Sequence, residues 1–252
     1  MLDTTKSTAL CLFVALASSL VGCAADTDET STEGETTSSE SSIIGGTVTN
    51  DYPAVGALTR FGQSFCTGTV VAPRLVVTAA HCLADLGGSS IRFALGTRAS
   101  APEASVAVRG YAAHPSYDAR QIRNDIGVVV LAEDAPVAPV AVNSSMTAEW
   151  VGHSLEFVGF GATNGFTGSG SGTKRAVTIP VSQVGATQFA YVDRSRNTCF
   201  GDSGGPAFAR GAEGQLVLVG VTSYGDARCT QFGVDTRVDA YRSFIAAALD
   251  QQ

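Results

Sequence analysis

Short apolar segments separated by polar turns make up most of the chain from Ile43 onward. They are rich in Val, Ile, Phe and Thr, and Gly, Asn, Asp or Pro bounds them. The pattern marks strands at 69–71, 75–78, 105–108, 126–131, 155–158, 177–181, 215–222 and 233–238. Because many short strands with close turns are typical of sandwiches and barrels, the pattern predicts an all-β protein.

The C-terminal segment differs from this pattern. Apolar residues recur there at helical spacing, which predicts one closing amphipathic helix over 239–250. The strand-rich region before it is long enough for two small β-domains, and the polar stretch 143–147 is a candidate junction. The sequence therefore suggests an N-terminal domain over 43–145 and a C-terminal domain over 146–238.

Residues 1–23 have the pattern of a signal peptide. A polar start containing Lys6 precedes mostly apolar or small residues from Ala9 to Val21. This run is shorter than the roughly 20 residues that cross a bilayer, so we expect export rather than a retained membrane span. The leader ends in LVGC, which is similar to the lipobox of bacterial lipoproteins. Two interpretations stay open: lipidation of Cys23, and ordinary cleavage just after it.

Most of the acidity precedes Ile43. The net charge of the 252-residue chain is −7, but seven of the 23 acidic residues and one of the 16 basic residues lie in 1–42. The nearly neutral remainder argues against binding to nucleic acid or to anionic lipid. Residues 24–42 are acidic and small, with no aliphatic side chain beyond alanine. They predict a flexible tether or propeptide, because they offer too little surface to bury.

The cysteine count fits an exported protein. After the leader, four of the six cysteines remain in the domain as an even set: Cys66, Cys82, Cys199 and Cys229. An even set is expected of disulfides, although counting cannot choose among its three pairings. Cys23 would be an odd thiol unless it is lipidated or removed.

The segment GDSGGP, 201–206, matches the G-x-S-x-G pattern of a serine nucleophile on a tight glycine turn. This pattern first suggests an α/β-hydrolase, in which the catalytic histidine follows the serine. All three histidines instead precede Ser203: His81, His114 and His153. The absence of alternating helices also argues against that fold.

Histidine, aspartate and serine in this order form another known arrangement of the triad. His81 ends the AAH of TAAHC, and Asp125 opens DIGVVVL. Serine is a weak nucleophile that needs a base, histidine can take and return its proton, and aspartate can fix the imidazole tautomer. The backbone N–H groups of Gly201 and Ser203 would face the developing oxyanion.

Four motifs in one order make the chain resemble the trypsin-like, chymotrypsin-fold serine peptidases, as a bacterial secreted or lipoprotein member. They are IIGG at 43–46, TAAHC at 78–82, DIGVVVL at 125–131 and GDSGGP at 201–206. The resemblance implies two six-stranded antiparallel Greek-key β-barrels with a C-terminal α-helix. The first barrel would carry His81 and Asp125, and the second would carry Ser203 and the primary specificity (S1) pocket.

The resemblance also implies the disulfides Cys66–Cys82 and Cys199–Cys229. The family's frequent third bridge has no cysteines here. We therefore expect the loop over 185–196 to be less constrained.

The IIGG motif resembles the mature N-terminus of this family, whose α-ammonium inserts beside the carboxylate preceding the nucleophile. The pair here would be Ile43 and Asp202. Because a buried carboxylate without a cation is costly, we expect the precursor to be nearly inactive until the Ser42–Ile43 bond is cut. Ser42 is neither Lys nor Arg, so a different protease is expected to make this cut. Pairing raises the pKa of the ammonium above about 8, so activity would fade in alkali.

By resemblance, seven residues form the S1 pocket: Asn197, Thr198, Ser223, Tyr224, Gly225, Gly233 and Asp235. A roomy pocket with a neutral floor at Asn197 favours aromatic or large apolar side chains. Asp235 stands where the family usually carries tyrosine, and it leaves two alternatives open. It could be a carboxylate for Arg or Lys, or the partner of Arg237 in a structural ion pair.

The sequence thus predicts a secreted serine endopeptidase with protein or peptide substrates and a monomeric catalytic domain. It indicates no cofactor and no metal, because the histidines lack ligand spacing and no acidic calcium loop is visible. It predicts contact with a membrane only through a lipid on Cys23. Two alternatives remain: a surface-tethered, non-catalytic binding module with this fold, and a zymogen that is never activated.

Overall fold

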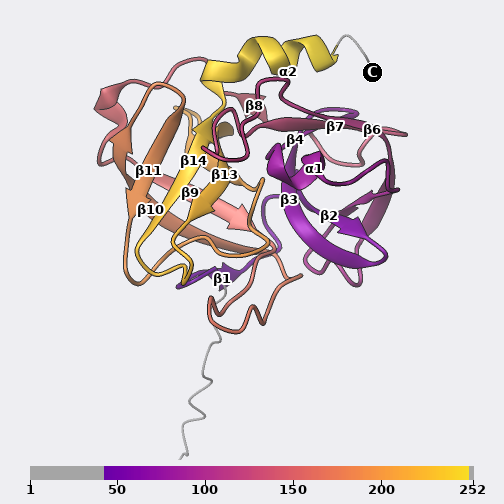
Figure 1. Cartoon of the computed structure of the whole chain (residues 1–252), viewed down its shortest axis with the longest axis horizontal. Coiled ribbons are helices and arrows are strands. Elements are labelled where there is room, and N and C mark those ends of the chain that lie inside the picture. Colours follow the sequence, from indigo (N-terminus) through magenta and orange to yellow (C-terminus); the bar gives the residue numbers. More distant parts are fainter. Residues whose placement is uncertain (1–42, 250–252) are drawn as a thin grey trace, which may run out of the picture. The chain divides into compact units, whose positions relative to one another are not determined.

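The computed structural model describes residues 43–249, which fold into two β-barrels followed by a short helix (Figure 1). The predicted signal peptide, Cys23 and the acidic segment 24–42 lie outside the described residues. Within 43–249, no helix is long and apolar enough to cross a membrane.

The first barrel is closed and antiparallel, with the strand order β2-β3-β4-β7-β6-β5. It appears in indigo and magenta in Figure 1. Its strands are β2 (Val55–Arg60), β3 (Gln63–Ala72), β4 (Leu75–Thr78), β5 (Arg92–Leu95), β6 (Ala104–Ala113) and β7 (Gly127–Leu131).

The second barrel has the order β9-β10-β11-β14-β13-β12 and closes because β9 pairs with both β10 and β12. Its strands are β9 (Ser154–Gly159), β10 (Arg175–Val184), β11 (Gln188–Val192), β12 (Pro206–Arg210), β13 (Leu216–Gly225) and β14 (Phe232–Arg237). Both barrels repeat the order first, second, third, sixth, fifth, fourth. The predicted fold of two six-stranded barrels is therefore confirmed.

Two short strands extend the second barrel. β1 (Thr47–Val48) pairs with β10 in antiparallel fashion, and β8 (Ala141–Val142) pairs with β13 in parallel fashion. The β8 pairing departs from the expected all-antiparallel arrangement.

Alternate side chains along the strands point inward and fill the barrel cores. On β10, Val177, Ile179 and Val181 point inward to join Phe157 and Phe189 in the core of the second barrel. Burying each such aliphatic side chain stabilises the fold by about 1.5–3 kcal/mol. β4 is buried at all four positions, which explains its continuous apolar sequence.

Within 43–249, four helical segments complete the fold. They are α1 (His81–Ala84), η1 (Ala148–Trp150), η2 (Asp239–Tyr241) and α2 (Arg242–Leu249), η denoting a 3-10 helix. The predicted closing helix is present, but its first turn is the 3-10 segment η2. Ile245 and Ala248 are buried on α2, and the ring of Phe244 contacts that of His114, with centroids 4.9 Å apart.

The segment over 185–196, expected to be loosely held, contains strand β11. β11 pairs with β10 on one side and with β14 on the other. The turn after it is organised by Asp193, which accepts hydrogen bonds from the backbone N–H of Ser195 at 2.8 Å and from Arg196 Nε at 2.9 Å. The hydrogen bonds of the β11 ladders and the Arg196–Asp193 ion pair therefore hold this segment in the absence of a disulfide.

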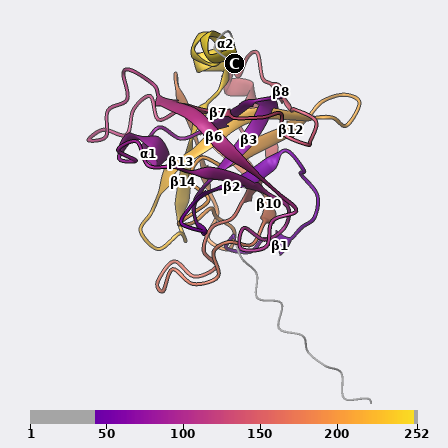
Figure 2. The same cartoon turned by 90° about the vertical axis from the view of Figure 1, so that its right-hand side faces the viewer.

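The two barrels meet along the loop that carries the candidate nucleophile. Thr67 N, on β3 of the first barrel, donates to Ser203 O at 2.8 Å. Thr67 Oγ1 donates to Gly201 O at 2.9 Å and accepts from Phe160 N at 3.1 Å. Figure 2, which looks onto the first barrel, shows the second barrel packed behind it. The candidate site therefore lies where the two barrels meet.

Candidate active site

His81 and Asp125 both come from the first barrel. His81 is the first residue of α1, three residues after the end of β4, and Asp125 lies two residues before β7. β4 and β7 are antiparallel neighbours, so Thr78 lies opposite Gly127 and the two residues come together. His81 Nδ1 lies 2.8 Å from Asp125 Oδ2, and the backbone N–H of His81 donates to Asp125 Oδ1 at 2.9 Å.

The second barrel also holds Asp125. Ser223 Oγ on β13 donates to Asp125 Oδ2 at 2.5 Å, and Thr236 Oγ1 on β14 donates to Asp125 O at 2.9 Å. Asp125 is fully buried, whereas 31% of the His81 side chain is exposed. The carboxylate is thus fixed in one orientation while the imidazole remains accessible. The sequence suggested Ser223 only as a pocket residue, and nothing in the sequence singled out Thr236.

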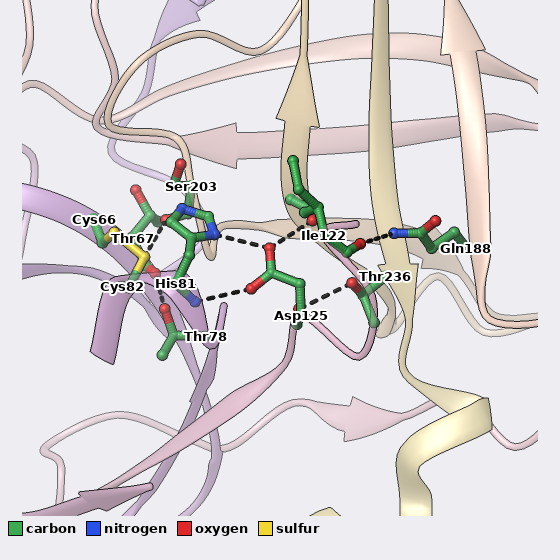
Figure 3. Close-up of polar contacts among 11 residues, drawn as sticks. Cys66, Thr67, Thr78, His81, Cys82, Ile122, Asp125, Gln188, Ser203 and Thr236 are labelled. Carbon is green, nitrogen blue, oxygen red and sulfur yellow. Dashed lines mark hydrogen bonds and ion pairs between the residues drawn. A yellow bond between two sulfur atoms is a disulfide. The ribbon is translucent and has the colours of Figure 1, made fainter. Parts of the chain in front are cut away.

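Ser203 comes from the second barrel, in the turn before β12. Figure 3 shows the His81 ring lying between Asp125 and Ser203. The chain around Ser203 is held by backbone bonds from Gly204 N to Thr222 O at 2.8 Å and from Gly205 N to Asp202 O at 2.7 Å. All three predicted triad residues are therefore together, although they come from both barrels.

The backbone before Ser203 has a conformation that suits an oxyanion site. Gly201 has φ +98°, and an added Cβ there would lie 3.0 Å from Gly161 Cα, so a side chain is excluded. Within 43–249, the N–H groups of Gly201 and Ser203 donate to no backbone carbonyl. Both donors remain available to an oxygen atom of a ligand.

Asp202, the predicted partner of a freed N-terminus, is buried between two backbone donors. Gly161 N donates to its Oδ1 and Cys199 N donates to its Oδ2, both at 2.8 Å. Burial raises the pKa of the Asp202 carboxyl to about 7, and these two N–H groups and Arg175 offset only part of that rise.

The predicted activation segment lies in the second barrel. Ile43 is buried in its core, and Ile44 forms an antiparallel bridge with Asn197 through a hydrogen bond from Asn197 N to Ile44 O at 3.0 Å. In the described part of the chain, no polar contact joins Ile43 to Asp202. The N–H groups of Gly161 and Cys199 hold this carboxylate, and the charge of Arg175 also acts on it.

Both disulfides that the resemblance implies are present. Cys66–Cys82 ties β3 to α1 beside His81, and Cys199–Cys229 braces the segment before the nucleophile. The sulfur atoms of Cys66 and Cys82 lie near His81 in a grouping that could otherwise suit a metal. Because the disulfide leaves no thiolate, this grouping does not fit a metal site.

A cavity of about 220 Å³ opens beside Ser203. Four of the predicted pocket residues line it: Thr198, Ser223, Tyr224 and Gly225. The lining also includes Cys199, Phe200, Thr222, Asp226, Ala227 and Cys229. The cavity therefore joins the two segments that the second disulfide holds together.

The other three predicted pocket residues do not line this cavity: Asn197, Gly233 and Asp235. Asn197 and Asp235 are at most 1% exposed. The ring of Tyr191 explains this difference, because it occupies the space next to Gly233. The alternative ion pair is also absent, because Arg237 binds Asp239 at 2.7 Å instead of Asp235.

A second cavity, of about 410 Å³, lies beside His81. Its lining includes His81, Phe61, Phe65 and Leu86, with the charged Arg60 and Asp85. Nothing in the sequence indicated this second cavity.

Two closed barrels with a His-Asp pair beside a serine on a glycine turn are the architecture of a chymotrypsin-fold serine peptidase. The family model for trypsin matches residues 43–245. The chain therefore belongs to the trypsin family of serine endopeptidases.

Relatives named as trypsins come from distant organisms. Trypsin from Saccharopolyspora erythraea is 32% identical over 220 residues, covering 79% of this chain and 94% of that protein. Trypsin beta from Drosophila erecta is 30% identical over 226 residues, covering 81% and 87%. Trypsin-3 from Salmo salar is 30% identical over 210 residues, covering 75% and 84%.

Proposed function

We propose that the chain is an exported serine endopeptidase that cleaves protein substrates through an acyl-enzyme on Ser203. His81 takes the proton of Ser203 Oγ as the serine attacks the peptide carbonyl, and it returns that proton to the leaving amine. Asp125 holds the imidazole tautomer, and the N–H groups of Gly201 and Ser203 stabilise the oxyanion. Water then hydrolyses the ester by the same route.

The observation that carries this proposal is the environment of Asp125. Its carboxylate accepts hydrogen bonds from His81 N and Ser223 Oγ and lies 2.8 Å from His81 Nδ1. A neutral imidazole held in this way donates from Nδ1 and keeps Nε2 free to accept a proton. This geometry also argues against a non-catalytic binding module, which would not need a fixed tautomer.

A serine-directed phosphonofluoridate tests the nucleophile directly. We expect the processed domain that begins at Ile43 to gain the mass of one phosphonyl group, which peptide mapping would find on Ser203. Acid-denatured enzyme, in which His81 and Asp125 are no longer held together, is expected to stay unlabelled. Labelling of the native enzyme at another residue only, or none at all, would refute the proposed mechanism.

We also propose that cleavage before Ile43 activates the enzyme by giving the Asp202 carboxylate an ammonium partner. Leaving one member of a buried ion pair alone costs about 3–5 kcal/mol, which is a factor of roughly 10²–10⁴. We expect the uncleaved chain to hydrolyse peptide substrates more slowly by such a factor. Equal kcat/KM for the two forms would contradict this switch.

The same switch has a signature in stability. In the uncleaved chain the pKa of Asp202 rises from 3.8 to about 7, so the folded state holds an extra proton across that range. Its free energy of unfolding should therefore fall as the pH rises, by about 4 kcal/mol from this group. Urea unfolding between pH 4 and 8 should show a smaller fall for the processed domain. Asp235 is buried in both forms and does not affect this difference.

The relation between processing and location follows from the sequence. If the leader directs export and a lipid on Cys23 anchors the precursor, cleavage at Ser42–Ile43 would release the catalytic domain. Because Ser42 is not basic, we propose that another protease performs this cleavage.

A further inference from the structure

We infer that Tyr191 closes the deep end of the S1 pocket and restricts it to uncharged side chains of small or medium size. This inference rests on the proposed function, because it concerns the residue whose carbonyl Ser203 attacks. It replaces the roomy pocket floored by Asn197 that the sequence predicted.

The phenol of Tyr191 reaches the floor of the cavity from strand β11. Its hydroxyl forms a hydrogen bond of 2.7 Å with Thr198 Oγ1, and Thr198 lines the cavity. Its ring packs against Phe157, with centroids 4.3 Å apart, and Tyr191 is fully buried. Core packing on one side and a hydrogen bond on the other thus fix the ring.

The ring fills the space that Gly233 leaves open. Tyr191 and Gly233 are directly opposite each other in the β11–β14 ladder. A Cβ added at Gly233 would meet the Cε2, Cζ and Oη atoms of Tyr191 far inside van der Waals contact. The absence of a side chain at Gly233 therefore makes room for Tyr191 and leaves no such room for substrate.

Two buried polar side chains, Asn197 and Asp235, lie behind this floor. Within the described residues, neither carboxylate oxygen of Asp235 and neither amide atom of Asn197 has a hydrogen bond of regular geometry. Burial raises the pKa of the Asp235 carboxyl well above its ordinary value, and the nearby hydroxyls of Tyr191 and Thr222 offset only part of that rise. The carboxyl group of Asp235 is thus buried behind the Tyr191 ring, where a lysine or arginine side chain of the substrate cannot reach it.

The remaining lining also offers no free carboxylate. Asp226 lines the cavity, but its oxygens accept N–H groups of its own loop, from Thr230, Gln231 and Phe232 at 2.7–3.2 Å. The cavity of about 220 Å³ is smaller than the roughly 300–1,000 Å³ of typical ligand pockets. Asp226 is the one charged residue in this lining, and Thr198 and Thr222 are polar and uncharged.

Profiling of the residue before the scissile bond tests the inference on the wild-type processed domain. Peptides differing only there, with Ala, Val, Leu, Phe, Lys or Arg, are compared by kcat/KM. We expect Ala, Val or Leu to exceed Lys, Arg and Phe by about 10- to 100-fold. Best cleavage after Lys, Arg or Phe would overturn the inference, whatever the variants do.

The Tyr191→Ala variant should open the pocket toward Asn197 and Asp235. Its kcat/KM for Phe and Arg, relative to Ala, is expected to rise at least about tenfold. Adding Asp235→Asn should remove the gain for Arg and keep the gain for Phe. Tyr191→Phe retains the ring and is expected to keep the wild-type order of preference. If a folded Tyr191→Ala variant keeps the wild-type order of substrate preference, the inference is also overturned. If Tyr191→Ala does not fold, Tyr191→Leu is used in its place.

The phosphonofluoridate label separates this inference from the proposed function. If the enzyme is labelled at Ser203 but cleaves best after Arg, the proposed mechanism stands and the closed pocket is refuted. If the enzyme is neither labelled nor active, both proposals are refuted.

Discussion

Replacing Ser203 with alanine in the processed domain is expected to lower kcat by about 10⁶-fold, the loss known for the nucleophile of another serine protease. The substitution removes the Oγ atom that would form the acyl-enzyme. It leaves the backbone N–H of residue 203 and the bond from Thr67 N to the carbonyl of residue 203 unchanged. The variant should therefore fold normally and still bind substrate. Initial rates on one peptide, with active-site titration of the wild type, measure the effect.

A matched variant distinguishes chemistry from misfolding. Ser243 lies exposed on α2, outside the site, so Ser243→Ala is expected to retain wild-type activity. A Ser203→Ala enzyme that keeps more than about one thousandth of the wild-type kcat, after contaminating protease is excluded, would show that Ser203 is not the nucleophile.

Changing Asp125 to asparagine should lower kcat by about 10⁴-fold, as the same change does in a related triad. Three donors converge on this carboxylate in the proposed tautomer: His81 N, His81 Nδ1 and Ser223 Oγ. An amide has one acceptor oxygen, so its NH₂ group would face a donor unless His81 moves its proton to Nε2. That tautomer cannot accept the proton of Ser203.

The Asp125 effect should appear in kcat much more than in KM, because the carboxylate is fully buried and does not touch substrate. Asp134→Asn provides the control, because Asp134 forms only an exposed ion pair with Arg74 and should leave the kinetics unchanged. A large rise in KM with an unaltered kcat for Asp125→Asn would mean that this residue acts in binding instead.

The strands could be predicted where β-branched residues dominate. β4 and β7, LVVT and GVVVL, have obvious strand sequences. Four barrel strands have weaker patterns: β2 (VGALTR), β5 (RFAL), β11 (QFAYV) and β12 (PAFAR). Alanine, glycine and proline do not favour strands locally, and partner strands on both sides of each impose the conformation.

Motifs could identify the three residues of the proposed triad but not the residues that support them. Ser203, His81 and Asp125 lie in recognisable segments. Thr67 acts through a contact with Gly201, more than 100 positions away, and Tyr191 acts through a contact with Thr198, seven positions away. Each of the two occupies an ordinary position in a strand. The extent of the pocket could not be predicted either, because side-chain packing decides which cavity a glycine opens.

The hydrogen bonds that Asp125 accepts and those that Thr67 donates also make enzymatic activity depend on how the two barrels are aligned. Base and carboxylate come from one barrel, the nucleophile comes from the other, and a few hydrogen bonds across the seam keep them aligned. A small slip of one barrel against the other would separate His81 from Ser203 while every strand stayed paired. The rate of peptide hydrolysis therefore reports on how well the two barrels are aligned. Under gentle heating or in low denaturant, we expect this activity to be lost before circular dichroism detects a loss of β-sheet.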